Sequence, residues 1–340
     1  MEIQFRSESH PLPMASARRR AGLGALLGML GCLAQSIPAQ AQTTTASSTQ
    51  ESMSDAWWTG PMLANSAETL PPGHFLFEPY LYDVRRARTS TFGSNTYMLY
   101  GLVNRLSIGM IPVIGYNQVS HGPNSSSVNV GDWTVQAQYR LTEFQQGSRI
   151  PTTAILVQET LPTGKYDRLG NRPADGMGSG TYTTTVWLNS QMYWWLPNGR
   201  ILRTRFNISK SFSRSARVRG VSVYGTDEGF RGRVKPGNGF FADLAFEYSL
   251  TQRWVLATDF TYSHNSNTRL AGLDFIDPGN VFVPQNVRSN SGSSTSFGVA
   301  PAIEYNWSPA IGVLLGTRVI FGGRNSSGSV TPAVAINYVY

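Results

Sequence analysis

The chain has 340 residues, of which 14% are charged and 41% hydrophobic, and its formal net charge is +8. Soluble domains carry about 25% charged residues, and beyond the N-terminal region no stretch approaches the roughly 18 apolar residues of a membrane-spanning helix. The composition therefore argues against a soluble domain and against a helical membrane protein. It favours a membrane-spanning β-barrel, in which only every second strand residue must be apolar.

The N-terminus has the three parts of an export signal. A run of arginines at residues 18–20 precedes an apolar stretch at residues 21–34, and Ala-Gln-Ala at residues 39–41 has the pattern of a cleavage site. We therefore predict that residues 1–41 are a signal peptide for the Sec pathway. Two alternatives stay open: residues 29–32 resemble a lipoprotein cleavage box, and Met14 competes with Met1 as the start.

Cys32 is the only cysteine and lies within the predicted signal peptide. After cleavage the mature chain would contain no thiol. It could then form no disulfide, no thiolate metal site and no cysteine nucleophile.

Residues 42–73 are predicted to be a flexible leader followed by a short N-terminal segment. The leader is rich in Thr, Ser and Gln. In the segment, Asp55 is placed to cap a short helix, and the prolines at residues 71–72 would end it. We expect this segment either to plug the periplasmic mouth of the barrel or to pack beside it.

Alternation of apolar and polar residues dominates residues 74–340, which are predicted to form the barrel. Residues 132–141 show it best, since every second side chain from Trp133 to Leu141 is apolar. The predicted strands are as long as the roughly 9–11 residues that cross a bilayer at a tilt. The twelve strands are expected near residues 74–84, 96–104, 106–117, 129–141, 151–161, 181–195, 200–212, 239–250, 253–264, 295–307, 310–321 and 330–340.

The connections alternate in length along the chain. The odd-numbered ones include the long, Gly- and Ser-rich stretches 162–180, 213–238 and 265–294, whereas the even-numbered ones are mostly short turns, with residues 142–150 as the exception. Long external loops and short periplasmic turns are typical of outer-membrane barrels with an even strand number. We therefore expect both ends of the barrel chain in the periplasm.

The C-terminus ends in an alternating apolar pattern with an aromatic last residue, from Val334 to Tyr340. This pattern resembles the signal that the barrel-assembly machinery reads, so this machinery is a predicted partner. Aromatic residues near strand ends are expected to form interfacial girdles. The candidates are Tyr80, Tyr82, Tyr116, Tyr139, Trp194, Trp195, Trp254, Tyr262 and Trp307.

No residue set predicts catalysis, a metal site or a cofactor. The histidines are His10, His74, His121 and His264, and none pairs with another at metal-ligand spacing. The glycines around Lys165 and at residues 176–180 are similar to phosphate-binding loops, but no amphipathic helix follows them. The chain is therefore not expected to be an enzyme. Its basic residues form no nucleic-acid-binding motif, so no nucleic-acid partner is expected.

Strand parity predicts which charges face the lumen. In the seventh predicted strand Leu202, Phe206 and Ile208 share the apolar face, which sends Arg203 and Arg205 inward. A charge facing lipid at the midplane costs roughly 2–4 kcal/mol, so this parity is physically enforced. The predicted lumen-lining residues are Arg140, Arg203, Arg205, Asp243, Glu247, Asp259, Glu304 and Arg318.

These charges support two hypotheses. The basic residues centre on the fourth to seventh strands and the acidic ones on the eighth to tenth, so an open lumen would carry a transverse field that orients a polar or anionic solute. Alternatively, the charges pair across the lumen and close it. Inward-facing small and polar residues favour the open lumen: Gly109, Gly115, Thr134, Gln136, Gly312 and Gly316.

Several stretches resemble the outer-membrane family of phenol meta-pathway degradation proteins, often called transporters. They are Trp57-Trp58-Thr59-Gly60-Pro61, Leu70-Pro71-Pro72-Gly73, Leu161-Pro162-Thr163-Gly164-Lys165-Tyr166-Asp167, Pro236-Gly237-Asn238 and residues 242–251. The resemblance covers nearly the whole mature chain. It implies a barrel in a Gram-negative outer membrane, associated with uptake of small aromatic or hydrophobic compounds, and no catalytic residue carries over.

The leading prediction is a passive channel for small molecules, with aromatic or hydrophobic compounds as candidate solutes. The alternative is a structural or partner-binding barrel with a closed lumen. The loop at residues 213–238 is rich in arginine, which an apolar solute does not explain. Phosphates of lipopolysaccharide would explain it, so outer-membrane lipid and lipopolysaccharide are predicted partners.

Overall fold

The computed structural model describes residues 50–276 and 283–340. The predicted signal peptide, Cys32 and most of the predicted leader lie outside this part. The only helical elements within it are two single turns, η1 (Met53–Asp55) and η2 (Pro173–Asp175). No helix there is long and apolar enough to cross a membrane.

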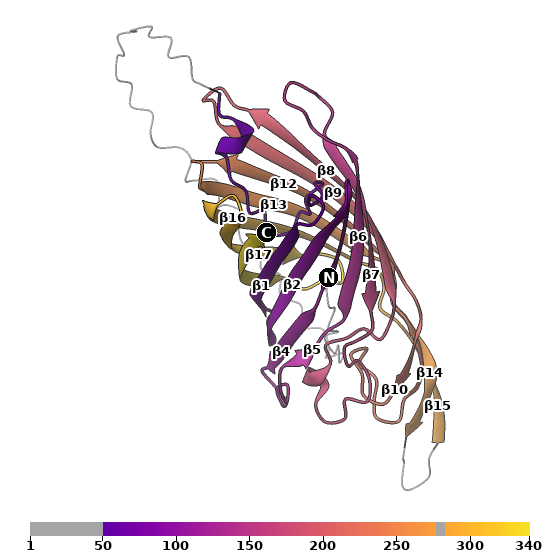
Figure 1. Cartoon of the computed structure of the whole chain (residues 1–340). Coiled ribbons are helices and arrows are strands. Elements are labelled where there is room, and N and C mark those ends of the chain that lie inside the picture. The colour runs from indigo at the N-terminus through magenta and orange to yellow at the C-terminus, as the bar shows by residue number, and fades with distance from the viewer. Residues whose placement is uncertain (1–49, 277–282) are drawn as a thin grey trace, which may run out of the picture.

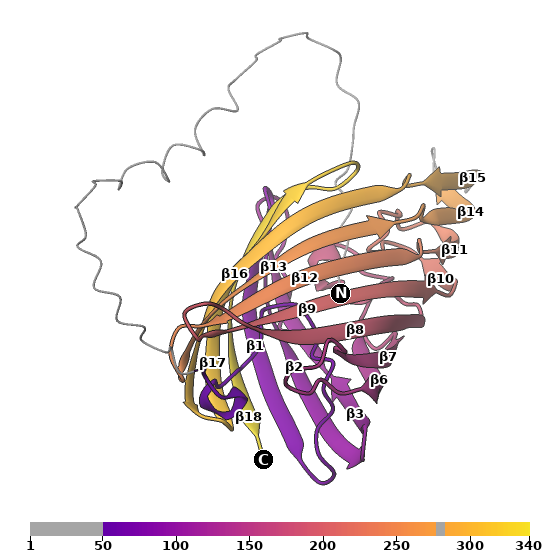
Figure 2. The ribbon, with the colours of Figure 1, turned by 90° about the horizontal axis from the view of Figure 1, so that it is seen from above.

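The described chain forms a closed antiparallel barrel (Figures 1 and 2). The order around the wall is β1-β18-β17-β16-β13-β12-β9-β8-β7-β6-β3-β2, and a direct β1–β2 pairing closes it. β3 and β4 are one wall strand interrupted at Pro112, so the wall has twelve strands, and the predicted fold class is confirmed. The wall strands are β1 (Phe75–Arg85), β2 (Thr89–Val103), β3 (Leu106–Ile111), β4 (Val113–Val119), β6 (Trp133–Thr142), β7 (Thr152–Leu161), β8 (Thr183–Trp195), β9 (Ile201–Ser213), β12 (Gly239–Ser249), β13 (Trp254–Asn265), β16 (Ser294–Ser308), β17 (Ile311–Gly322) and β18 (Ser329–Val339). The short β5 (Asn129–Val130) pairs with β4.

Every predicted strand has a counterpart, but β2 begins earlier than expected, at Thr89 instead of residue 96. Residues 89–95 are rich in Thr, Ser and Gly and therefore look like a loop in the sequence. They nevertheless pair with β1 down to the Arg85–Ser90 position. A Cβ on Gly93 would lie 2.6 Å from the Tyr82 hydroxyl oxygen, so a glycine is needed to let the two strands meet there.

Two of the predicted long loops are partly strands. β10 (Ala216–Arg219), β11 (Arg231–Lys235), β14 (Arg269–Ile276) and β15 (Val283–Asn290) form a second sheet in the order β10-β11-β14-β15. This extension sheet continues β9, β12, β13 and β16 beyond the barrel (Figures 1 and 2). The strands are short, and only one of their faces is apolar, which made them hard to separate from loops in the sequence.

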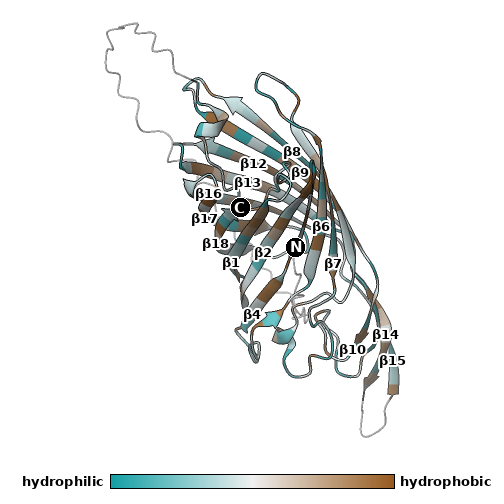
Figure 3. Cartoon of the chain, in the orientation of Figure 1, coloured by the Kyte–Doolittle hydropathy of each residue, from teal (hydrophilic) through white to brown (hydrophobic). Residues whose placement is uncertain are grey.

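The outer wall is apolar, with exposed side chains such as Phe206, Leu244, Phe260, Leu315 and Ile336. Along the strands, hydrophobic residues alternate with polar ones (Figure 3). Burying such a band requires an apolar surrounding, which a bilayer provides. The barrel is therefore of the transmembrane kind.

The girdle prediction is right for some aromatic residues and wrong for others. Tyr139, Trp194, Trp254 and Trp307 are exposed at the ends of their strands. Three others face inward instead. Tyr80 and Tyr82 pack against a buried cluster that contains Met62, and Trp195 stacks on Phe144 with 6.4 Å between ring centroids. Position near a strand end does not by itself distinguish the inner face from the outer one.

Candidate functional site: a charged cluster around the luminal segment

Neighbouring strands β9 and β12 carry the centre of the site on their inner faces. Arg203 and Arg205 alternate with outward residues such as Phe206, and both guanidinium groups are buried. Glu247 lies directly opposite Arg203 in the β9–β12 register. The alternation that exposes the apolar side chains of these strands thus places the charges together inside the barrel.

Glu247 binds both arginines. Its Oε2 accepts a hydrogen bond of 2.7 Å from Arg203 Nε, and its Oε1 accepts a second one from Arg203 Nη2. Arg205 Nε lies 3.0 Å from Glu247 Oε2. The Arg203 guanidinium also lies over the Trp58 ring, 4.5 Å from the centroid. Two cations and one anion are therefore fixed within one small volume.

The space beside this ion-pair cluster is occupied by residues 56–73, which we call the luminal segment. Asp259 on β13 accepts hydrogen bonds from the backbone N–H groups of Met62, Leu63 and Ala64, at 3.1, 3.3 and 3.0 Å. Glu304 on β16 accepts from those of Thr59 and Gly60, at 2.7 and 3.1 Å. The two buried carboxylates thus satisfy backbone donors that no strand pairs.

The other half of the luminal segment is held by β3, β6 and β8. Gln138 Nε2 donates to the Glu68 carbonyl at 2.7 Å, and Gln191 Nε2 donates to Glu68 Oε1 at 2.7 Å. Leu70 N donates to Ser107 Oγ at 2.8 Å. The segment therefore crosses the interior of the barrel, from the β13–β16 side to the β3–β6 side.

Several inward-facing glycines make room for the luminal segment. A Cβ on Gly312 would lie 2.1 Å from Thr59 Oγ1, and one on Gly316 would lie 2.4 Å from Met62 Sδ. At Gly115 the neighbour is Met177, whose Cε is 2.7 Å from the position of a Cβ. For Gly115, Gly312 and Gly316, the inference that small residues keep the lumen open is therefore wrong, because protein atoms fill the space they leave.

The remaining candidates lie at varied positions. Arg205 Nη1 donates to the Ala64 carbonyl at 2.8 Å. Asp243 is fully buried, and Arg205 and Arg318 interact with it electrostatically. Arg140 pairs with Glu143 at 3.0 Å, near the turn after β6 and outside the cluster. The structure thus brings Arg203, Arg205, Glu247, Asp259 and Glu304 together around one segment.

Arg203 and Arg205 lie on the seventh wall strand and Glu247 on the eighth, so the cluster sits where the predicted basic and acidic parts of the wall adjoin. Arg203 and Glu247 are on adjacent strands, so their charges compensate side by side. The alternative, pairing across the lumen, is not what these two do. Instead, the acids Asp259 and Glu304 reach the backbone of the luminal segment. Charge parity in the sequence located these residues but did not identify their partner.

At the opposite end, where the long loops lie, residues 162–180 fold into the barrel mouth. Asp132 accepts hydrogen bonds from Gly164 N at 2.9 Å and Ser179 N at 2.7 Å, and burial raises its pKa. Met177 is fully buried. Gly164 and Gly178 approach so closely that a side chain on either would meet the other's backbone. The glycines that are similar to a phosphate loop thus serve close backbone packing.

Asp175 anchors the same loop to residues 124–129. It accepts hydrogen bonds from Ser126 N at 2.7 Å and from the Ser126 hydroxyl. Burial raises the pKa of Asp175, but these hydrogen bonds and that from Asn129 outweigh burial and leave its pKa below the ordinary value.

The family comparison agrees with this architecture. The family described as "Putative MetA-pathway of phenol degradation" matches residues 60–336. The chain belongs to this family. The match starts within the luminal segment and ends in β18, so membership in the phenol meta-pathway family covers the barrel and its internal segment together. The recognised resemblance is confirmed.

A solved structure shows the same fold. An outer membrane channel from Pseudomonas putida F1 is similar over 82% of this chain and 100% of that chain, with a TM-score of 0.58 and 15% identity. The NanC porin is similar over 77% of this chain and 98% of that chain, with a TM-score of 0.41 and 10% identity. No curated protein sequence matches the chain.

The sequence did not identify Trp58, Glu68, Gln191 or Asn306 as members of the site. Asn306 Nδ2 donates to the Trp57 carbonyl at 3.1 Å, and Tyr193 OH donates to Glu68 Oε1 at 3.0 Å. A usable signal existed in the inward parity of Asn306 and Gln191. Their partners on the luminal segment, Trp57 and Glu68, could not be found in this way, because this segment has no alternation of apolar and polar residues.

Proposed function

We propose that the protein is a channel of a Gram-negative outer membrane, closed in this state by its own luminal segment. Small molecules cross passively when the segment shifts. The short turns and both ends of the barrel face the periplasm, and the long loops face the exterior. The protein acts without catalysis, follows Sec export and uses its C-terminal strand as the recognition element for the barrel-assembly machinery.

The observation that carries this proposal is the mode of attachment at Asp259. The carboxylate holds three consecutive backbone N–H groups, of Met62, Leu63 and Ala64. A hydrogen bond to a charged group contributes about 1.5–3 kcal/mol, and water can replace the carboxylate at each N–H. The segment is thus held by separate polar contacts that water can replace one at a time, as a movable closure requires.

Aromatic and hydrophobic compounds are the proposed solutes. The family description supports this choice. So does an aromatic cluster beside the luminal segment, in which the rings of Trp58 and Tyr193 lie 6.4 Å apart and those of Phe144 and Tyr193 lie 5.4 Å apart. A partly apolar path suits an aromatic solute better than a sugar.

Planar-bilayer recording tests the channel. We expect wild-type protein to show rare, brief openings, and a variant lacking residues 56–70 to show steady conductance. A graded variant is Asp259→Asn, which keeps one neutral amide oxygen as acceptor and should give intermediate opening frequency. If the deletion variant folds, as shown by heat-modifiable migration in gels, but conducts no more than wild type, the luminal segment is not the closure.

A structural or partner-binding barrel is the second candidate, and the occupied interior favours it. Liposome swelling with a panel of phenols, aromatic acids and sugars distinguishes the two. A channel gives faster swelling with at least one phenol or aromatic acid than protein-free liposomes do. Equal rates for the whole panel, with wild type and with the deletion variant, would reject transport.

A further inference from the structure

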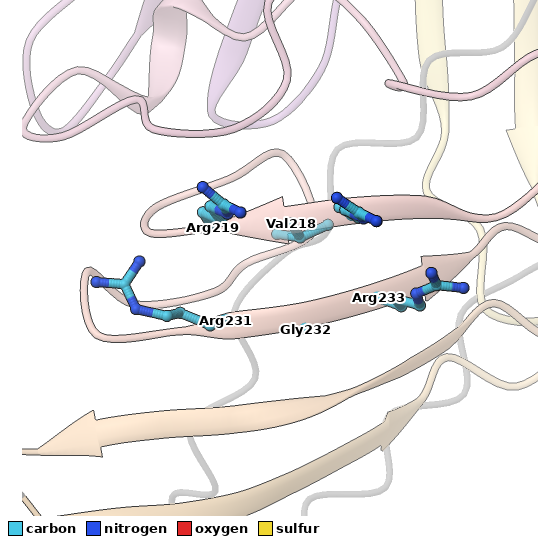
Figure 4. Close-up of a pocket in the computed structure, with 6 residues that line it drawn as sticks. Val218, Arg219, Arg231, Gly232 and Arg233 are labelled. Atoms are coloured by element: carbon cyan, nitrogen blue, oxygen red, sulfur yellow. The ribbon is translucent and has the colours of Figure 1, made fainter.

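The extension sheet concentrates basic side chains on one face. In the register, Arg217 lies opposite Arg233 and Arg219 lies opposite Arg231, while Lys235 lies opposite Arg269. Figure 4 shows the arginines of β10 and β11 around a shallow hollow of about 550 Å³. We call this surface the arginine face; its basic residues are Arg217, Arg219, Arg231, Arg233, Lys235, Arg269 and Arg288.

The hydrogen-bond pattern shows that the arginine face points away from the barrel axis. Between β12 and β13, even-numbered β12 positions form the hydrogen-bonded pairs, as when Ser266 N donates to Asn238 O. Between β11 and β14, the odd-numbered positions of the earlier strand form the hydrogen-bonded pairs. An example is Phe275 N, which donates to the oxygen of Gly229, just before β11. In L-residues, the direction of N–H and C=O fixes the face of the side chain. Because even-numbered β12 side chains point outward, the odd-numbered arginines of β11 do so too.

The same phase shift occurs on the next pair of strands. Between β13 and β16, Asn306 N donates to Arg253 O, at an odd position of the earlier strand. Between β14 and β15, Ser291 N donates to Thr268 O, at an even one. At residues 236–238 and 266–268 the parity of the side chains therefore switches. Odd-numbered side chains of β12 and β13 point into the barrel, whereas odd-numbered side chains of β11 and β14 point outward.

The opposite face of the extension sheet is covered by the chain itself. Val218, Phe230, Val234 and Leu270 form a buried cluster there, against which Tyr166 and Tyr224 pack. Tyr166 belongs to the loop that folds into the barrel mouth, so this apolar face looks toward the mouth. The arginine face is left exposed on the outside of the barrel.

The arginine face is electrostatically unbalanced. Like charges directly opposite each other on two strands are unfavourable. Among the described residues, none of the seven basic side chains forms an ion pair. Such an arrangement is costly by itself and becomes favourable when an anion lies on it.

We propose that the arginine face binds the phosphate groups of lipopolysaccharide in the outer leaflet around the barrel. Arginine forms bidentate hydrogen bonds with phosphate. The face lies above the apolar band on the outer wall, which ends near the exposed Phe212 and Phe297. Arg217 follows Phe212 by five positions, or roughly 17 Å of extended strand. The arginine face is therefore placed to contact lipid that surrounds the barrel, and not a solute that enters the pore.

Binding of fluorescently labelled lipopolysaccharide to the purified full-length barrel in mixed micelles tests the proposal. The probe is used intact and with its phosphates removed by hydrofluoric acid. For Arg219→Gln combined with Arg231→Gln we expect roughly 30-fold weaker binding of the intact probe, the equivalent of about 1 kcal/mol for each arginine. Dephosphorylated probe should bind wild type at least as weakly as the intact probe binds the variant. Arg219→Lys combined with Arg231→Lys should restore part of the affinity.

The matched control removes two exposed arginines at the other end of the barrel, Arg105→Gln with Arg149→Gln, and should leave binding unchanged. Equal binding of intact probe by wild type and the Gln variant, or equal binding of intact and dephosphorylated probe, would overturn the proposal. Heparin that competes at lower concentration than lipopolysaccharide would point instead to a soluble polyanion. This inference rests on the proposed outer-membrane location and orientation but not on transport. A negative conductance result therefore leaves it standing.

Discussion

Glu247 lies opposite Arg203 in the sheet, and both of its carboxylate oxygens accept hydrogen bonds from that one guanidinium. Both side chains are buried, so each charge depends on the other for compensation. Removing one partner of a buried ion pair costs about 3–5 kcal/mol, whereas replacing both by apolar groups is often close to neutral.

Glu247→Gln should therefore lower the free energy of unfolding by about 3 kcal/mol or more, because Arg203 and Arg205 would both lose their buried anion. Urea unfolding in lipid vesicles, followed by tryptophan fluorescence, measures this. The double variant Arg203→Met with Glu247→Leu should be destabilised by less than the sum of the two single changes, because the two share the Arg203–Glu247 interaction. A double variant as unstable as the sum of the two singles would contradict the pairing.

Asp259→Ala should release the luminal segment, because three backbone N–H groups lose their acceptor. The measurement is labelling of Ala64→Cys by a water-soluble maleimide, since Ala64 is buried in the closed state. We expect labelling to accelerate about 10-fold or more. Asp83→Ala, which removes a carboxylate outside the cluster, should leave the labelling rate unchanged. Unchanged labelling in Asp259→Ala would mean that this carboxylate does not hold the segment.

Gly312→Val should displace the luminal segment by steric exclusion, since even a Cβ would lie 2.1 Å from Thr59 Oγ1. The expected result is more frequent opening in planar bilayers with an intact barrel. Leu315→Val, on the outer face of the same strand, serves as the control. A Gly312→Val protein that folds and opens no more often than the control would refute the steric role of Gly312.

The anchoring of residues 124–129 should depend on pH through Asp175. Its pKa is lower in the folded protein than the ordinary 3.8. A depressed carboxyl pKa stabilises the fold above the ordinary value, and this contribution is lost as pH falls through the folded pKa. A spin label at Ser127→Cys should therefore stay immobile at neutral pH and become mobile only below about pH 3.8. Asp175→Asn should be mobile already at neutral pH, and an immobile label in that variant would exclude the anchor.

The barrel wall could be predicted from the sequence because each wall strand has one apolar and one polar face. Its residues therefore alternate between apolar and polar. Residues 132–141 and 200–212 were placed correctly for this reason. Their inward residues followed from parity, since lipid excludes charge from the other face. Even Arg203 and Glu247 could be assigned to the same interior without knowledge of their pairing.

The interior could not be predicted, because the luminal segment has no regular period. Its position depends on backbone N–H groups at Met62 to Ala64, and every residue but proline carries one. The orientation of the extension sheet was hidden for another reason. The hydrogen-bond phase shifts near Pro236-Gly237-Asn238, and a parity count carried through this point assigns Arg231 and Arg233 to the wrong face.

The continuity of the luminal segment with β1 has a consequence for how the molecule is made. Residues 71–73 lead directly into the strand that pairs with β18, the last strand of the chain. The seam that completes the cylinder is thus formed by the element to which the occupant is tethered. The first wall strand of the chain cannot complete its pairing until the last one, β18, has been made. Pairing of β18 with β1 therefore closes the barrel and fixes the base of its occupant at the same place.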